Sequence, residues 1–138
     1  LEESALSPSQ AVPETRASAG RYEAALVALR DGRTEEAERE LLAFAREEPT
    51  SDLADNAWFW LAESRLARGH TAGAIEAYRT AIDRYPEGNK IPDALFKLGV
   101  AFEAVGNGGA AREAWQELVR RFPTSAAAET AAERLEAP

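Results

Sequence analysis

The chain has 138 residues, with 24 acidic and 16 basic side chains and a formal net charge of −8. It has no cysteine, so it cannot form a disulfide framework or a thiolate zinc site. The acidic balance argues against a protein that follows nucleic-acid phosphates with a basic stripe, and no apolar run approaches the ~20 residues that a membrane span needs. Size and composition predict one domain with its own core.

Residues 1–17 form the first segment, which carries two prolines, three serines and no sustained hydrophobic period. We interpret this segment as a disordered linker. Because the first residue is Leu1 and not methionine, we expect the sequence to be a mature or excised fragment that has lost a targeting segment upstream.

From about residue 18 the sequence repeats. Pro49, Pro86 and Pro123 lie 37 residues apart, and a fixed period between about 20 and 50 residues indicates a repeat architecture. The same shift aligns three glycines, three alanines and three large apolar residues, which are Gly32, Gly69 and Gly106, Ala37, Ala74 and Ala111, and Leu41, Tyr78 and Trp115.

Each unit is predicted to be a helical hairpin. In the second unit, residues 56–68 and 72–85 both show apolar side chains at helical spacing. Gly69 would end the first helix in the left-handed conformation, Thr71 would cap the second, and Pro86 would stop it. In the third unit Gly108 replaces this threonine, so a looser turn is expected.

Three such hairpins need a lid, since stacked repeats expose an apolar face at their end. Residues 126–136 are mostly alanine and glutamate, as a capping helix should be. The predicted fold is therefore all-α, a right-handed superhelical solenoid with a domain at 18–138. Its units span about 18–51, 55–88 and 92–125, followed by the capping helix.

These units resemble the tetratricopeptide repeat, whose motif has a tryptophan, a leucine–glycine pair, then alanine, an aromatic residue, alanine and proline. The period of 37 residues is longer than the usual 34. The resemblance implies a module that binds other proteins. The second unit matches through Trp58, Leu61, Ala62, Ala74, Tyr78, Ala81 and Pro86, and the third through Leu95, Leu98, Gly99, Phe102, Ala111, Trp115, Leu118 and Pro123.

The extended linkers, such as EGNKIPD at 87–93, are similar to those of the C-terminal domain of the YbgF/CpoB family of the Tol-Pal system. This resemblance implies a non-enzymatic periplasmic adaptor in cell division, with TolA as partner and a peptidoglycan synthase as a further candidate. In that family a coiled coil precedes the domain and forms trimers. We expect a monomer from the sequence given, and a trimer stays open for the full-length protein.

The candidate partner-binding residues are those of the first helices that should face the concave groove. Tyr22, Phe59 and Phe96 would form an aromatic ladder there, suited with its acidic neighbours to a peptide with apolar anchors and basic flanks. The alternative is that these aromatics only wedge between helices. The full set is Tyr22, Leu26, Leu29, Asn56, Phe59, Glu63, Leu66, Asp93, Phe96, Val100 and Glu103.

Nothing in the sequence indicates catalysis. His70 is the only histidine and follows a turn glycine, so we predict no enzyme, no metal and no cofactor. An alternative function is a structural subunit of another envelope assembly, like the outer-membrane lipoprotein BamD. That family needs about five hairpins and a lipidated cysteine, both of which this sequence lacks. A co-chaperone clamp would need lysine and asparagine where Tyr22, Phe59 and Glu63 stand.

Overall fold

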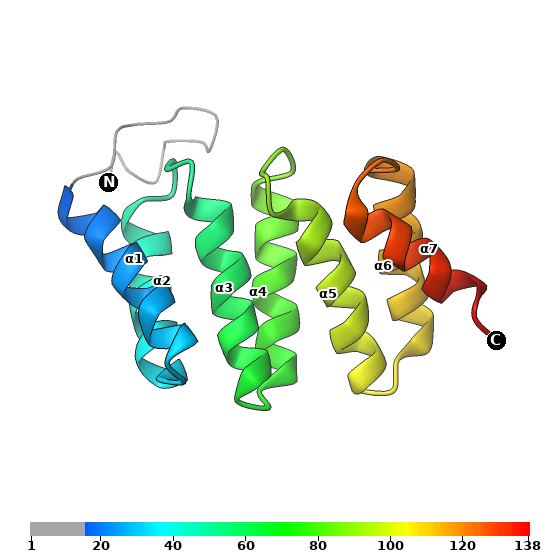
Figure 1. The fold of residues 1–138 in the computed structure, drawn as a ribbon, viewed down its shortest axis with the longest axis horizontal. Coiled ribbons are helices and arrows are strands. Elements are labelled where there is room, and N and C mark those ends of the chain that lie inside the picture. The colour runs from blue at the N-terminus through cyan, green and yellow to red at the C-terminus, as the bar shows by residue number, and fades with distance from the viewer. Residues whose placement is uncertain (1–15) are drawn as a thin grey trace.

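The computed structural model describes the backbone of residues 16–138 and the side chains of residues 17–138. This part of the chain consists of helices joined by short turns (Figure 1). The helices are α1 (Arg16–Arg30), α2 (Thr34–Glu47), α3 (Ala54–Ala67), α4 (Thr71–Arg84), α5 (Ile91–Ala104), α6 (Gly108–Arg121) and α7 (Ala126–Glu136).

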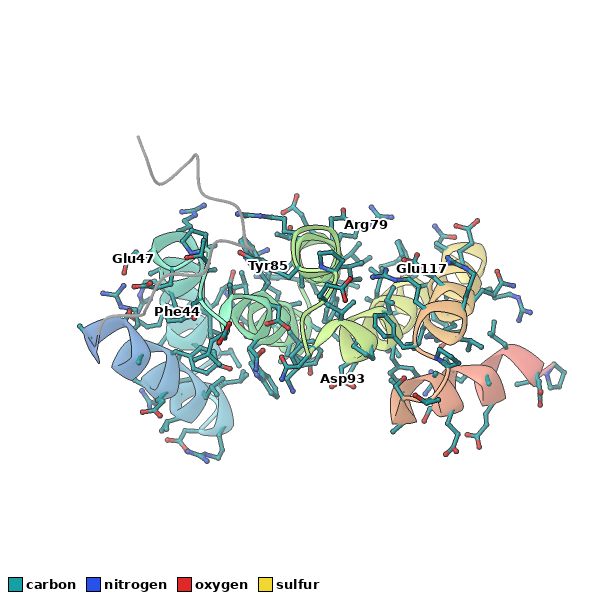
Figure 2. The ribbon with its side chains drawn as sticks, turned by 90° about the horizontal axis from the view of Figure 1, so that it is seen from above. Phe44, Glu47, Arg79, Tyr85, Asp93 and Glu117 are labelled. Carbon is teal, nitrogen blue, oxygen red and sulfur yellow. The ribbon has the colours of Figure 1, made fainter. Side chains whose placement is uncertain are left out.

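The helices stack in sequence order as three antiparallel hairpins, α1–α2, α3–α4 and α5–α6, and α7 closes the row (Figure 1). Seen from above, the odd-numbered helices form one layer and α2, α4 and α6 form the other (Figure 2). The all-α class with a capping helix is therefore confirmed. The predicted linker lies outside the described residues except at its end, where α1 begins at Arg16, two residues before the predicted boundary.

The hairpin turns use glycine as predicted, but their caps differ. Gly32, Gly69 and Gly106 have φ of 83°, 80° and 81°, which only glycine adopts easily. The prediction that Thr71 caps α4 is wrong, because the helix begins at Thr71 and its N-cap is His70, with no side-chain hydrogen bond. The third turn has a cap that was not predicted, since Asn107 accepts a hydrogen bond from the Ala110 amide.

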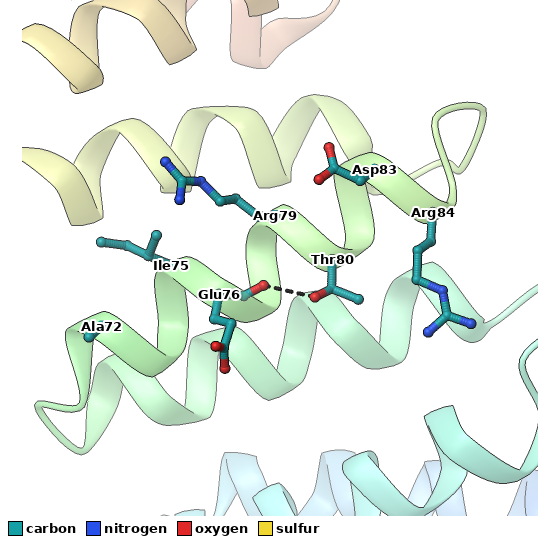
Figure 3. A pocket seen from close by; sticks show the side chains of 7 residues that line it. All are labelled: Ala72, Ile75, Glu76, Arg79, Thr80, Asp83 and Arg84. Atoms are coloured by element: carbon teal, nitrogen blue, oxygen red, sulfur yellow. Dashed lines mark hydrogen bonds between the residues drawn. The ribbon is translucent and has the colours of Figure 1, made fainter.

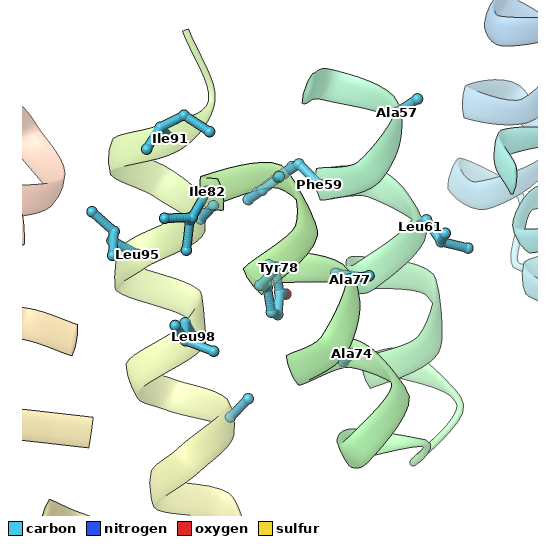
Figure 4. Close-up of a cluster of buried hydrophobic side chains, with 14 of the residues drawn as sticks. Ala57, Phe59, Leu61, Ala74, Ala77, Tyr78, Ile82, Ile91, Leu95 and Leu98 are labelled. Carbon is cyan, nitrogen blue, oxygen red and sulfur yellow. The ribbon is translucent and has the colours of Figure 1, made fainter. Parts of the chain in front are cut away.

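The core lies between the two layers. Each second helix places one large side chain there, and Leu41, Tyr78 and Trp115 are all buried. Alanines around them let the helices approach closely, as Ala74 and Ala77 do beside Tyr78 (Figure 4). The repeat of small and large positions along the sequence is therefore a repeat of packing, with each unit burying its apolar stripe against the next.

Candidate functional site

The predicted binding residues lie on α1, α3 and α5. At the two ends of the layer of odd-numbered helices, α1 and α7 project further from the opposite layer than α3 and α5 do (Figure 2). We therefore call this layer the inner face. The exposure of these residues varies widely. Leu26, Leu29, Asn56, Glu63, Leu66, Phe96 and Val100 are half-buried, Asp93 and Glu103 are exposed, and Tyr22 and Phe59 are buried.

The aromatic ladder is not an open surface. Tyr22 is 6% exposed and Phe59 is 5% exposed, so neither ring offers the open aromatic surface that the sequence predicted. Each ring packs on the second helix of its own hairpin. The centroid of Tyr22 lies 5.3 Å from that of Phe44, and the centroid of Phe59 lies 5.9 Å from that of Tyr78. The alternative, that the aromatics fill space between helices, is the better description.

Phe96 is half-buried and stacks on Trp115, with ring centroids 6.2 Å apart. Arg134 of α7 covers both rings, since its guanidinium carbon lies 5.2 Å from the centroid of Phe96 and 5.5 Å from that of Trp115. Such cation–π contacts contribute about 0.5–2 kcal/mol. The capping helix therefore shields the last aromatic residue of the predicted ladder.

The carboxylates of the inner face are paired with cations. Glu63 accepts a hydrogen bond from the Tyr78 hydroxyl and lies 3.6 Å from the Lys97 ammonium. Glu103 lies 3.6 Å from Arg134, and Asp93 lies 3.9 Å from Lys90. The predicted attraction for basic flanks is therefore weak here, and the half-buried apolar residues are the stronger feature of the surface.

Lys90 belongs to the linker between α4 and α5, and the sequence predicted no contact for it. Its ammonium lies 5.1 Å from the ring centroid of Phe59 and 5.0 Å from that of Trp60. The linker thus folds back over the start of α3. The period of 37 residues makes this linker long enough to reach α3. This extra length is the one feature of the sequence that could have indicated the contact.

Asp55 holds the same linker in place. Its side chain is buried, and its carboxylate accepts a hydrogen bond from the Lys90 amide at 2.9 Å. A methyl group on Gly88 would lie 2.4 Å from a carboxylate oxygen of Asp55, so only glycine fits there. Beside this contact lies a hollow of about 410 Å³, between the α2–α3 linker and the α4–α5 linker. It is lined by Thr50, Ser51, Asp52, Asp55, Arg84, Tyr85, Pro86, Glu87 and Gly88.

Burial raises the pKa of the Asp55 carboxyl, although hydrogen bonds from backbone amides oppose the shift. A raised folded-state pKa gives stability that is fully present below the unfolded value of about 3.9 and is lost as pH rises through the folded value. Asp55→Asn keeps an acceptor for the Lys90 amide but cannot ionise. We therefore expect the unfolding free energy of the variant, minus that of the unsubstituted chain, to be larger at about pH 7 than at about pH 4. Urea unfolding at both pH values measures this difference, and a constant or shrinking difference would contradict the expectation.

Among residues 16–138 no group of three or more histidine, aspartate or glutamate side chains is placed to hold a metal ion. None of the helices in this range is long and apolar enough to cross a membrane. His70 is exposed at the N-cap of α4.

Comparison with known proteins agrees with this architecture. Two tetratricopeptide repeat models match the sequence, one over residues 22–89 and one over residues 93–125. Among curated proteins the sequence has no significant match. The crystal structure of MamA superposes with a TM-score of 0.66 at 19% identity, covering 85% of this chain and 67% of MamA.

A tetratricopeptide repeat protein from Parabacteroides merdae gives a TM-score of 0.49 at 16% identity, covering 88% of this chain and 60% of that protein. At this level of identity the likeness to MamA shows a shared fold alone. The two matching models together cover most of the three hairpins. The chain therefore belongs to the tetratricopeptide repeat family, whose domains typically serve as scaffolds for protein–protein interaction.

Proposed function

We propose that this domain is a non-enzymatic adaptor that holds a segment of a protein partner along its inner face. The observation that supports this is a strip of half-buried apolar residues, Leu26, Leu29, Leu66 and Val100, on three neighbouring helices. Leu26 and Val100 occupy one place of the repeat, and Leu29 and Leu66 occupy another about one helical turn further on, so all four face the same side. Apolar anchors in a row suit an extended or helical segment with apolar residues at regular spacing.

We propose further that the adaptor is periplasmic and that its partner is TolA or a protein like it. The support for this narrower function is the resemblance of the long linkers to those of the YbgF/CpoB family. Asp55, Gly88 and Lys90 give these linkers a structural role, because they fix the linker on the start of α3.

The test is a titration of this chain with the purified helical periplasmic domain of TolA. Leu66→Glu places a charge in the middle of the apolar strip and should weaken binding by about tenfold or more, the loss typical of a central anchor. Val119→Glu is the matched control, since Val119 is also half-buried but lies on α6 in the opposite layer. Circular dichroism establishes that both variants fold.

Binding that Leu66→Glu loses and Val119→Glu keeps would support both parts of the proposal. Binding that is indifferent to Leu66→Glu would reject the inner face as the contact surface. The absence of binding to TolA would reject the Tol-Pal assignment.

A further inference from the structure

The packing of α2 on α3, here called the first junction, contains a network of charged side chains. Glu38 accepts hydrogen bonds from Arg65 at 3.1 Å and from Arg68 at 2.6 Å. Arg68 also reaches Glu35 at 3.2 Å, and Arg65 donates to the carbonyl of Gly73 at 3.0 Å. Four charged residues thus form a hydrogen-bonded network at the surface where the first two hairpins meet.

The second junction, where α4 packs on α5, differs at every one of these positions. The residues 37 places further along are Ala72, Ile75, Phe102 and Val105, which replace Glu35, Glu38, Arg65 and Arg68. We call these four residues the junction patch. Val105 is 54% exposed, and Ala72 is exposed as well, while Ile75 is half-buried. The same repeat geometry therefore presents ions at one junction and an apolar patch at the next.

A hollow of about 210 Å³ adjoins the patch between α4 and α6. Its floor is apolar, with Leu95, Leu98 and Phe102 from α5. Arg79 lies over it, with its guanidinium carbon 5.0 Å from the ring centroid of Phe102. Figure 3 shows Ile75 and Arg79 pointing to the same side of α4. Phe102 is 8% exposed and Arg79 is exposed, so a ligand would reach the ring by displacing this arginine.

The rim of this hollow is acidic. Asp83, Glu113 and Glu117 line it together with Arg79. Glu117 pairs with Arg121 at 2.6 Å, whereas Asp83 and Glu113 take part in no ion pair within residues 17–138. An apolar floor with unpaired carboxylates beside it is complementary to a cation next to an apolar side chain.

We propose that the junction patch and its hollow form a second docking site, which binds a basic partner segment that inserts a bulky aliphatic or aromatic side chain. The inserted side chain would contact Phe102, Ile75 and Val105, and its basic neighbours would face Asp83 and Glu113. This site lies at the second junction and shares no residue with the apolar strip of the inner face. It is independent of the adaptor surface proposed above.

Three short helical peptides serve as probes, and heteronuclear NMR of this chain reads out binding. The first carries leucine and lysine, the second carries leucine with glutamate in place of each lysine, and the third carries lysine with alanine in place of each leucine. The leucine–lysine peptide should bind and shift the resonances of Ile75 and Val105. The other two should bind about tenfold more weakly or worse, because one reverses the charge and one removes the anchor.

The decisive variant combines Ala72→Glu with Val105→Arg, which copies the Glu35–Arg68 pair of the first junction onto two exposed positions. Binding of the leucine–lysine peptide should fall by about tenfold or more, while urea unfolding should show a folded domain. Val27→Arg is the control, because Val27 is also an exposed valine but lies on α1, away from the second junction, and it should leave this binding unchanged.

Binding that survives the double variant, or equal binding of all three peptides, would overturn the proposal. Sedimentation velocity tests whether a second copy of this chain occupies the surface. Concentration-dependent dimers that the double variant abolishes would assign the patch to a second copy of the chain instead.

Discussion

Replacing Gly99 by alanine is expected to lower the free energy of unfolding by about 2–5 kcal/mol, as overpacking plus the loss of a buried hydrogen bond. A methyl group at Gly99 would lie 2.1 Å from the indole nitrogen of Trp115. Trp115 is 3% exposed and donates this N–H to the carbonyl of Phe96 at 3.0 Å. The indole therefore cannot move away without losing its partner. Urea unfolding monitored by circular dichroism measures the change.

Gly20→Ala is the matched control, because Gly20 is also helical and a methyl group added there would meet no neighbouring atom within 4 Å. This change should stabilise the domain by about 0.5–1 kcal/mol, the usual gain of alanine over glycine in a helix.

A second variant tests the mechanism. The second unit has Ala62 and Tyr78 where the third has Gly99 and Trp115. Adding Trp115→Tyr to Gly99→Ala should recover part of the lost stability, since it restores a pair that packs in the neighbouring unit. A double variant no more stable than Gly99→Ala would place the strain elsewhere.

The architecture could be predicted because the repeat constrains it many times. One glycine per hairpin must adopt positive φ, and one proline per unit must end a helix, so the same residues recur at Gly32, Gly69 and Gly106. The range predicted for the capping helix, residues 126–136, is that of α7. The run of alanine and glutamate after the last proline predicts a helix. Capping was less predictable. Asn107 and Ser125 cap their helices, whereas Thr71 does not, since competing backbone geometries decide this locally.

The candidate surface was predicted less well than the fold. Helical spacing shows that Tyr22 and Phe59 share a face, but a residue on the inner face also borders the adjacent helix of its own hairpin. Their burial depends on the ring contacts with Phe44 and Tyr78, which periodicity does not encode. The pairing of Glu63 and Glu103 with Lys97 and Arg134 was missed for the same reason, since each pair joins neighbouring helices of the stack.

The junction patch could have been found from the sequence. The 37-residue shift that aligns the prolines also aligns Arg68 with Val105 and Glu38 with Ile75. The shared prolines and glycines define the fold of each unit. The positions that change from a charged residue in one unit to an apolar residue in the next mark where the surfaces of the two junctions differ.

Glu38→Gln is expected to lower the free energy of unfolding by about 1–3 kcal/mol at neutral pH. The side chains of Glu38, Arg65 and Arg68 are 21%, 17% and 26% exposed, so the network lies between a surface ion pair and a buried one. Glutamine keeps the shape but leaves the half-buried guanidinium of Arg65 without a counter-charge and leaves Arg68 with Glu35 alone. Glu36→Gln on the same helix, whose partner Arg33 is exposed, is the control and should leave the urea midpoint unchanged.

The pH dependence gives a second readout. Burial alone would raise the pKa of Glu38, but hydrogen bonds from Arg68 and Arg65 outweigh it and hold the pKa below its usual range. A lowered folded-state pKa gives stability that is present above the unfolded value of about 4.3 and is lost as pH falls through the folded value. The stability difference between the unsubstituted chain and Glu38→Gln should therefore shrink in acid. A difference that stays constant would mean that glutamine disturbs packing and not charge.

The two junctions also predict what happens when the whole network is removed. Replacing Glu35, Glu38, Arg65 and Arg68 together by alanine, isoleucine, phenylalanine and valine copies the second junction onto the first. Because apolar replacement of a buried ion network is often neutral or stabilising, this fourfold variant should unfold at a urea concentration equal to or above that of the unsubstituted chain. Glu38→Gln alone should be less stable than both. The ions at the first junction would then contribute little net stability, and their effect would be to keep that surface polar. A fourfold variant less stable than Glu38→Gln would show instead that the network is needed to hold α2 on α3.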